Sequence, residues 1–503
     1  MPAGFLALTP VPVIAHTAGH FASSDLAFYV KPFTPEEARE IVMSLEKPAV
    51  FRNMVLDWPA LHWNVKYLCE MLGSKTLQFR MGVKKMDTAP QFETKCSFVE
   101  ATLEEFLAWN CEPSACSSGP FHSYDSSKYW AYADYKYIAR IFEDKADIFQ
   151  EVKWSDFGFL GRNGRESTLW IGSAEANTPC HVDSYGCNLV LQVQGRKRWH
   201  LFPPEETSFL YPTRIPYEES SIFSQVNVVN PDLKNFPLFK RAQAHVVTLN
   251  PGQGRGNKIN QGSGTFSLPK RRLTGSSNTY RAATRKRVLF VPRRWWHYVE
   301  SIDQSTVSIN SWIELDTDHE ARVEEAITRT LVCAIKSVEN PSIDDAWLNP
   351  TEVSTLLVSL DLTDVSLKIL LDNAKLEGCL LPAFDSGLTK AKAKKFSKIP
   401  FGLNLIQVLP QLQEGNSTGG RRVESDRGDL INENEEGHFG KLPFTGKPSV
   451  MNNEYGTLAD QTDPDSQASS CPTAISTNDL LDCVVNPQVV SLVARLLLDR
   501  ARV

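Results

Sequence analysis

Several common signatures are missing from this chain of 503 residues, and each absence narrows the class of protein. None of the ten cysteines forms a C-x-x-C pair, which argues against a zinc ribbon or a thioredoxin-type redox site. No apolar run reaches the roughly 18–20 residues of a membrane-spanning helix. The mildly apolar segment 5–15 has no Lys or Arg before it, so it is a poor signal peptide. The scattered cysteines suit reduced thiols, so we expect a cytoplasmic protein, with the nucleus as the alternative.

A general excess of positive charge is also missing. The formal net charge is −6, which excludes a protein that binds nucleic acid over its whole surface but leaves room for a local basic patch. Hydrophobic residues make up 42% of the chain and charged residues 22%, so most of it can bury a core. The length allows about two to four domains, or one large domain with appendages.

Two capping boxes mark helix starts in the N-terminal part. Thr34 is followed by Glu37, and Thr102 by Glu105, so we expect helices to begin at both threonines. Between about 167 and 315 short β-rich runs are separated by Gly and Pro, which predicts a β-sandwich or barrel. The fold class is therefore α+β and β-rich, with N-terminal helices. The expected strands are 167–172, 188–194, 198–202, 244–249, 288–291 and 306–312.

The C-terminal part changes character twice. Helical periodicity in Val353, Leu356, Leu357 and Leu360 predicts a C-terminal helical subdomain. The following region has few large apolar residues, which predicts a disordered tail, whereas an apolar stretch at 488–499 predicts a terminal helix that docks on the body or on a partner. The expected domains are an irregular lead at 1–33, the β-rich domain at 34–315, the helical subdomain at 316–400, the disordered linker or tail at 401–480 and the terminal helix at 481–503.

One short stretch has the pattern of a metal site. His181 and Asp183 are two positions apart, and such side chains leave the same face of a strand. An imidazole and a carboxylate so placed can occupy adjacent positions on one metal ion. A second histidine from a neighbouring strand would complete a two-His-one-carboxylate triad, which suits non-haem Fe(II). The His-x-Asp pattern alone is weak, and His297, which follows two tryptophans, is the candidate for the third ligand.

Further short motifs surround this pattern between residues 34 and 315. They are Leu169-Trp-Ile-Gly172, Thr178-Pro-x-His-x-Asp183, Gly195-x-Lys-Arg-Trp199, Leu201-Phe-Pro-Pro204, Pro251-Gly252, Leu289-Phe-Val-Pro292 and Trp295-Trp-His297. Together these motifs resemble those of the JmjC-type cupins, in the subgroup related to the asparaginyl hydroxylases and the tRNA wybutosine hydroxylase. This resemblance implies a double-stranded β-helix (jelly-roll or cupin) core with Fe(II) and 2-oxoglutarate as cofactors. It also implies that His181, Asp183 and His297 are the iron ligands.

The same resemblance implies residues that hold 2-oxoglutarate. Lys197 matches the lysine that pairs with its distal carboxylate, and Thr178 matches a hydroxyl donor to that carboxylate. Asn188 and Asn310 match amides beside the cofactor, and Tyr129 resembles the first tyrosine of a Tyr-Leu-Ala-Gln pattern. A dicarboxylate needs two bonding centres, a metal at its oxo-acid end and a cation with a hydroxyl at its far end, so the set is chemically consistent.

A basic segment departs from the family pattern. Residues 254–287 hold nine Lys or Arg and no Asp or Glu, and they separate Pro251-Gly-Gln253 from Val288-Leu-Phe-Val-Pro292. Three interpretations stay open: a splice or gene-model artefact such as translated intron, a disordered loop, or a basic arm for RNA or another acidic partner. We expect the barrel to tolerate the segment, because each doubling of a loop costs only about 0.6 kcal/mol of closure free energy.

Two functions compete, and a third is weaker. The complete ligand set favours an Fe(II)- and 2-oxoglutarate-dependent dioxygenase that hydroxylates a protein or RNA substrate. The tail and the basic segment favour a partner-binding protein of the same fold with little or no turnover. One member of the family associates with a small heat-shock protein. For the partner-binding alternative, the resemblance therefore implies a small heat-shock protein as the partner and a role in the stress response. A histone demethylase is less favoured, because no reader domain or zinc-finger spacing accompanies the motifs.

Overall fold

The computed structural model describes residues 30–84, 87–111, 119–251, 286–316, 318–336, 349, 399–411 and 477–501. Almost all of them belong to one compact unit made of Met1–Gln411 and Leu481–Val503. The second unit, Leu412–Leu480, is described only at residues 477–480. Most of the expected lead, helical subdomain and tail, and residues 254–285 of the basic segment, lie outside the described residues.

The α-helices begin where the sequence provides caps. Both expected capping boxes are present: the hydroxyls of Thr34 and Thr102 accept the backbone N–H groups of Glu37 and Glu105, and each glutamate side chain accepts the N–H of its threonine. No helix within the described ranges is long and apolar enough to span a bilayer. The α-helices are α1 (Pro35–Ser44), α2 (Val65–Leu72), α3 (Leu103–Cys111), α4 (Ile138–Ile141), α5 (His319–Lys336), α8 (Thr477–Val484) and α9 (Pro487–Ala501). Short 3₁₀ turns lie at Pro59–His62, Glu93–Lys95, Ala146–Glu151, Trp154–Phe157, Gly164–Glu166, Pro204–Phe209 and Pro237–Arg241.

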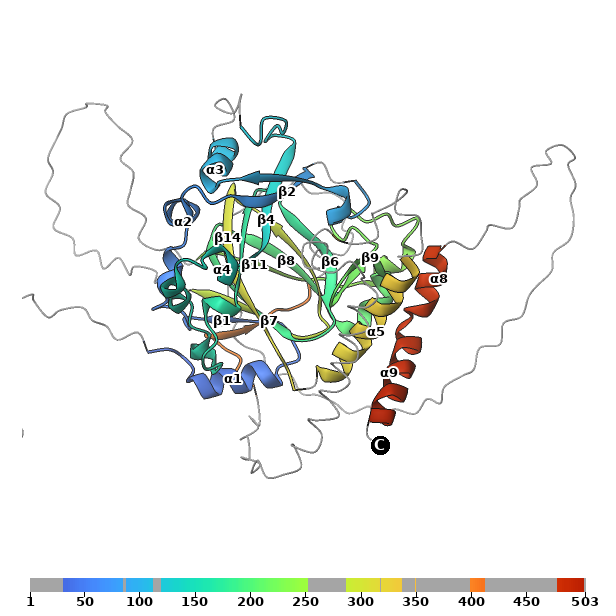
Figure 1. The fold of residues 1–503 in the computed structure, drawn as a ribbon. Coiled ribbons are helices and arrows are strands. Elements are labelled where there is room, and N and C mark those ends of the chain that lie inside the picture. The colour runs from blue at the N-terminus through green and yellow to red at the C-terminus, as the bar shows by residue number, and fades with distance from the viewer. Residues whose placement is uncertain are drawn as a thin grey trace, which may run out of the picture. The chain divides into compact units, whose positions relative to one another are not determined.

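The strands form two antiparallel sheets at the centre of this unit (Figure 1). The larger sheet has the order β15-β1-β12-β7-β14-β5-β4-β2-β3, and the smaller has the order β11-β8-β13-β6-β10-β9. This architecture confirms the β-rich α+β fold. The strands are β1 (Ala49–Arg52), β2 (Leu77–Val83), β3 (Ser97–Ala101), β4 (Tyr129–Tyr137), β5 (Thr168–Ser173), β6 (Asn177–Asp183), β7 (Cys187–Gln194), β8 (Lys197–Phe202), β9 (Pro212–Glu218), β10 (Ser221–Ser224), β11 (His245–Leu249), β12 (Arg287–Val291), β13 (Trp296–Ser301), β14 (Ser305–Ile313) and β15 (Leu405–Gln407).

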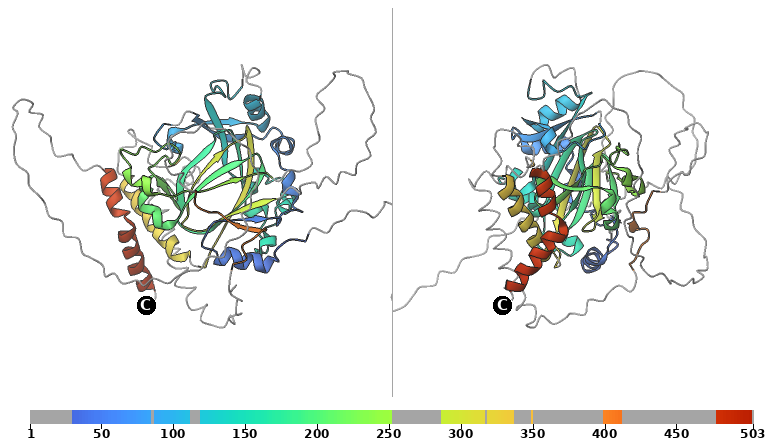
Figure 2. Two further views of the ribbon diagram at one scale, coloured as in Figure 1. Left: turned by 180° about the vertical axis from the view of Figure 1, so that it is seen from behind. Right: turned by 90° about the vertical axis from the view of Figure 1, so that its right-hand side faces the viewer.

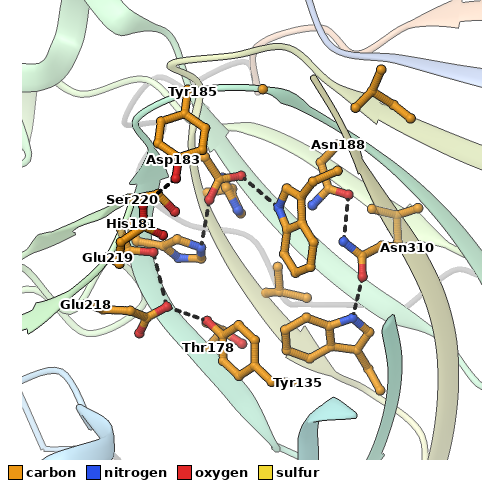
Figure 3. Close-up of a pocket in the computed structure, with 18 of the residues that line it drawn as sticks. Tyr135, Thr178, His181, Asp183, Tyr185, Asn188, Glu218, Glu219, Ser220 and Asn310 are labelled. Carbon is orange, nitrogen blue, oxygen red and sulfur yellow. Dashed lines mark hydrogen bonds and ion pairs between the residues drawn. The ribbon is translucent and has the colours of Figure 1, made fainter. Parts of the chain in front are cut away.

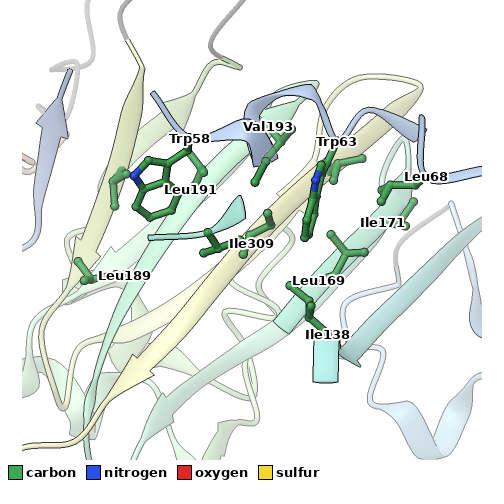
Figure 4. Close-up of a cluster of buried hydrophobic side chains, with 14 of the residues drawn as sticks. Trp58, Trp63, Leu68, Ile138, Leu169, Ile171, Leu189, Leu191, Val193 and Ile309 are labelled. Carbon is green, nitrogen blue, oxygen red and sulfur yellow. The ribbon is translucent and has the colours of Figure 1, made fainter. Parts of the chain in front are cut away.

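The larger sheet has two chemically different faces, because side chains alternate along each strand. On β7, Leu189, Leu191 and Val193 join the main apolar core, where Trp58 and Trp63 of the N-terminal segment cover them (Figure 4). The alternate positions of β7, β14 and β5 carry polar and aromatic residues that line a cavity inside the barrel. Those residues are Asn188, Ser308, Asn310, Trp312 and Trp170.

Three expected boundaries differ from the structure. The tail cannot begin at 401, because β15 pairs with β1 at the edge of the larger sheet. The last two residues of the basic segment belong to the barrel: the Lys286 carbonyl accepts the N–H of Asn53, and Arg287 pairs with Arg52. The expected terminal helix is two helices, α8 and α9.

The C-terminal helices are fastened to the barrel through α5. Val323 and Ile327 of α5 pack against Val490 and Ala494 of α9, so the two helices run alongside one another (Figures 1 and 2). Further along, Val332 of α5, Leu481 of α8 and Val485, which directly follows α8, pack with the buried ring of Tyr217 at the end of β9. These apolar contacts fix both C-terminal helices to the smaller sheet.

A buried carboxylate completes this attachment. Glu325 of α5 accepts hydrogen bonds from the Arg214 guanidinium, from the Tyr217 hydroxyl at 2.9 Å and from the backbone N–H of Ser220 at 3.0 Å. Arg214 and Glu325 are both buried, so each charge is stabilised by the other and not by water.

Replacing this carboxylate should loosen the helix. We expect Glu325→Ala to lower the free energy of unfolding by about 3–5 kcal/mol, because it leaves the buried Arg214 charge unpaired. Urea denaturation measures the loss. The exposed Glu320 on the same helix gives the control, Glu320→Ala, for which we expect a change within about 0.5 kcal/mol. Equal losses for the two variants would contradict this role.

Candidate metal centre

Strand pairing brings the three expected metal ligands together. β6 and β13 are neighbours in the smaller sheet, and their register places His181 directly opposite His297. The register then shifts, so that Val299 lies opposite Thr178 and β6 holds one extra residue. This β-bulge changes the phase of β6. Thr178, His181 and Asp183 therefore all line the same cavity (Figure 3).

The triad has the spacing of groups that share one ion. The ligand atoms of His181, Asp183 and His297 all lie within 4.8 Å of one another. The Nε2 atom of His181 is 3.8 Å from Oδ1 of Asp183, which is too long for a hydrogen bond between them. Ligand atoms about 2.0–2.2 Å from a common metal ion lie roughly 3–4 Å apart, so the arrangement fits a metal ion.

Backbone carbonyls orient both imidazoles. Nδ1 of His181 donates to the Pro179 carbonyl at 2.9 Å, and Nδ1 of His297 donates to the Trp295 carbonyl at 3.0 Å. These bonds leave Nε2 of each ring as a lone-pair donor to a metal. Burial, with the neighbouring His181, lowers the pKa of His297 to about 4, so its ring is neutral at pH 7 and ready to ligate.

An aromatic and amide wall faces the triad. The Trp312 indole donates to Oδ2 of Asp183 at 3.3 Å, which holds the carboxylate beside the histidines. Along the same wall Trp170 donates to Asn310 at 2.7 Å, and Asn310 donates to Asn188 at 3.0 Å (Figure 3). The chain of bonds fixes both amides at the cavity surface, where they can orient a polar ligand.

The cavity is about 490 Å³ in volume and contains a buried lysine as well as the triad. The side chain of Lys197 is 2% exposed and donates to the Tyr132 hydroxyl at 3.0 Å and to Ser308 Oγ at 2.9 Å. Both of these partners are neutral. Burial lowers the pKa of Lys197 to about 7, and the charge of Asp134 opposes that shift.

The nearest acid is already engaged by another cation. Asp134 accepts a 2.6 Å bond from Nε of Arg80, which also donates to the Asn177 carbonyl at 2.9 Å. Arg80 is fully buried, and its guanidinium lies over the rings of Trp130 and Tyr132. Among the described residues, Lys197 therefore makes no ion pair of its own.

Seven of the eight expected site residues line this one cavity. They are His181, Asp183, His297, Lys197, Thr178, Asn188 and Asn310. Tyr129 is the exception and has to be corrected: its ring packs edge-on against Tyr124 in the apolar core, with ring centroids 5.2 Å apart. Three residues on, Tyr132 lies on the opposite face of β4 and contacts Lys197. Tyr132 and Ser308 were not among the expected site residues, although Ser308 stands two positions before Asn310 on the same strand face.

Tyrosines and glutamates line another part of the cavity. The Tyr135 hydroxyl donates to Glu218 at 2.9 Å, and the Tyr185 hydroxyl donates to Glu219. Arg322 of α5 lies over the Tyr185 ring, 4.5 Å from its centroid, so helix α5 also contributes to the cavity lining.

Comparison with known proteins agrees with this geometry. The two antiparallel sheets with a His-Asp-His triad inside define a protein with a cupin-like, JmjC-type domain, and a family model described as a cupin-like domain matches residues 35–253. A "Lysine-specific demethylase 8" from Xenopus tropicalis is 26% identical over 55% of this chain and 50% of its own length.

The family follows from nearer relatives. The "HSPB1-associated protein 1" of Homo sapiens is 52% identical over 99% of both chains, and the "HSPB1-associated protein 1 homolog" of Danio rerio is 47% identical over 94% of this chain and 98% of its own. The chain belongs to the HSPB1-associated protein 1 family.

Removing a triad carboxylate should remove the metal. We expect purified Asp183→Ala to hold less than about a tenth of the iron that the unchanged protein holds after anaerobic loading, because two histidines alone bind weakly. Elemental analysis of the desalted protein gives the metal content. Asp303→Ala, in which a half-buried carboxylate paired with Arg196 is lost outside the cavity, is the matched control and should keep its iron. Equal iron in both variants would remove Asp183 from the ligand set.

Proposed function

We propose that this protein is an Fe(II)- and 2-oxoglutarate-dependent dioxygenase that hydroxylates a protein or RNA substrate in the cytoplasm, with the nucleus as the alternative compartment. One observation carries the proposal: the cavity that contains the His-Asp-His triad also contains a buried lysine whose partners are two hydroxyls. A buried cation of this kind is expected to have an anionic partner, and a bound carboxylate would supply it.

The residues present fit both cofactors. His181, Asp183 and His297 would hold the iron, and Lys197 with Tyr132 would hold the far carboxylate of 2-oxoglutarate. Thr178 adds a hydroxyl from the same side of the cavity, bonded to Tyr132. Ser308 accepts a hydrogen bond from Lys197, so hydroxyls on two strands, β4 and β14, hold the Lys197 amino group in place.

When bound, iron and 2-oxoglutarate supply the oxidation, in which O₂ is consumed, the oxo-acid is decarboxylated to succinate and CO₂, and one oxygen atom enters the substrate. The protein supplies position and shelter. Trp312 orients the metal-binding carboxylate, and the two histidine Nδ1 bonds orient the imidazoles. Trp170 and Trp199 are part of the cavity wall, and apolar rings there keep bulk water from the reacting atoms.

The lysine gives the direct test. We expect Lys197→Met to weaken 2-oxoglutarate binding about ten- to hundred-fold, because a charge-assisted bond of about 1.5–3 kcal/mol is lost, while iron content stays unchanged. Calorimetric titration under anaerobic conditions measures the affinity, and succinate release in air measures turnover.

The neighbouring residue on β8 is the matched control. Arg198 points away from the cavity and pairs with Glu300 at 3.2 Å, so Arg198→Met removes a charge from the same strand without touching the site. It should bind 2-oxoglutarate as the unchanged protein does. If 2-oxoglutarate binds Lys197→Met with unchanged affinity, the lysine does not hold it. If the unchanged protein neither binds 2-oxoglutarate nor releases succinate, the dioxygenase proposal is wrong.

A second function, binding a small heat-shock protein, is favoured by two observations. The relatives are named for association with HSPB1, and α9 presents an apolar stripe on the side away from α5. Val489, Leu492, Val493 and Leu496 follow the i, i+3, i+4, i+7 pattern of one helix face and are 37–57% exposed. An amphipathic or apolar segment of the partner fits such a face.

Charges on this stripe should abolish that binding. We expect the double variant Leu492→Glu, Leu496→Glu to lose binding to purified HSPB1 by at least about tenfold, because two carboxylates would be desolvated in the interface. Asp183→Ala should bind as the unchanged protein does, which separates this function from the metal centre. Titration with labelled HSPB1 measures the affinity. Binding that survives both charges would place the contact elsewhere.

A further inference from the structure

We propose that this site takes up one proton when it binds a dicarboxylate, and that Lys197 is the group that receives it. Affinity for 2-oxoglutarate then falls as the pH rises above neutrality. The inference rests on the proposed function, because it concerns the same anion in the same cavity. It adds that the anion and a proton bind together.

The partners of Lys197 accommodate either protonation state. The hydroxyls of Tyr132 and Ser308 can accept hydrogen bonds from an ammonium group, and they can equally donate one to the lone pair of a neutral amine. A carboxylate partner would instead stabilise the charged form alone. The two hydroxyl contacts therefore keep the side chain in place without fixing its charge.

Burial, and not a neighbouring cation, disfavours the charged form of the lysine. The side chain of Lys197 is 2% exposed, and this burial lowers its pKa to about 7. The charge of Asp134 opposes the shift, but its carboxylate accepts the 2.6 Å bond from Nε of Arg80 and makes no ion pair with Lys197. Lys136 donates to the Asp134 backbone carbonyl at 2.8 Å.

The other groups around Lys197 leave this balance unchanged. The sheet register places Leu249 of β11 and Ser301 of β13 opposite it, and neither titrates. Trp170 of β5 and Thr178 of β6 also do not titrate, and burial raises the pKa of the Tyr132 hydroxyl, so it stays protonated. The remaining ionisable groups are Arg80 on β2 with Glu93 and Cys96 beside it, Asp134 and Lys136 on β4, the cavity-lining residues Tyr135, Tyr137, Tyr185, Glu218, Glu219, Glu314, Arg322 and Arg329, and the triad, whose members would hold the metal.

The sign of the pH effect follows from linkage. Lys197 is half protonated in the free site near pH 7, and a bound carboxylate stabilises the ammonium form and raises its pKa. Below pH 7 the free site is already charged, so affinity changes little. Above pH 7 binding has to bring a proton with it, so the dissociation constant should rise about tenfold per pH unit up to the pKa of the complex.

Calorimetry counts the proton directly. The iron-loaded full-length protein is titrated with 2-oxoglutarate without oxygen, at pH 8 in two buffers of different ionisation enthalpy. We expect most of one proton to be taken up per 2-oxoglutarate at pH 8 and little at pH 6, because the pKa of Lys197 in the free site is about 7. A series from pH 6 to 9 should give a dissociation constant that is flat below pH 7 and rises above it. No turnover is needed for either readout.

Two variants identify the group. Lys197→Arg carries a charge that is permanent at these pH values, so it should bind 2-oxoglutarate without proton uptake and without the rise above pH 7. Tyr132→Phe keeps the titrating amine and should keep the proton uptake.

The titrations separate this inference from the proposed function. Binding to the unchanged protein with no proton uptake overturns this inference and leaves the proposed function standing. Proton uptake that persists in folded Lys197→Arg assigns the proton to another group and also overturns it. If Lys197→Arg shows no melting transition, the flat-then-rising pH series of the unchanged protein decides by itself. Absence of any 2-oxoglutarate binding overturns the proposed function and this inference with it.

Discussion

The antiparallel pairing of β6 with β13 is the contact on which the candidate site depends. It sets His181 against His297 across more than a hundred residues of chain, and it does so through backbone hydrogen bonds that need no metal. The extra residue in β6 falls beside Pro179, which has no N–H to give to a ladder, so a bulge there disrupts little pairing. Without that phase change Thr178 and His181, three positions apart, would face opposite sides of the strand. Hydroxyl and ligands share a cavity because of it.

Apolar burial by the larger sheet offsets the free-energy cost of its polar interior. One face of β7 and β14 lies under Trp58 and Trp63 and buries a large apolar area, which is the favourable term of the fold. The other face carries Asn188 and Asn310. Oδ1 of Asn310 accepts from the Trp170 indole, and its Nδ2 donates to Oδ1 of Asn188. Arg80 of β2 and Asp134 of β4 are both buried, and they form an ion pair with each other. The neutral hydroxyls around Lys197 leave that one cation available to an incoming anion.

Local signals in the sequence predicted the fold well, whereas contacts set by strand phase escaped it. Thr34 and Thr102 predicted their helices correctly, because capping depends only on neighbouring residues. His181 and Asp183 predicted a shared face, because residues i and i+2 lie on the same face of a regular strand. Tyr129 was the wrong tyrosine of its motif: β4 points Tyr132 into the barrel, and the motif alone does not give the phase of a strand. β9 begins with a proline, which weakens its strand pattern, and β15 is a strand of only three residues at the border of the polar tail. The hydroxyl partners of Lys197 come from β4 and β14, so only the closed barrel shows them.

The helix α5 is where the two proposed functions meet. Its outer neighbour α9 carries the apolar stripe, and its own Glu325 accepts the N–H of Ser220. Ser220 in turn accepts the N–H of Ser184, the residue that follows Asp183. A continuous path of packed side chains and hydrogen bonds thus leads from α9 to the residue beside Asp183, and Arg322 of α5 lies over the Tyr185 ring in the cavity lining. A partner that bound α9 and shifted α5 would change the cavity lining and the support of Asp183 together. A partner that bound α9 without shifting α5 would leave the cavity lining and Asp183 unchanged. Whether α5 moves therefore decides whether the partner site and the candidate metal site are coupled.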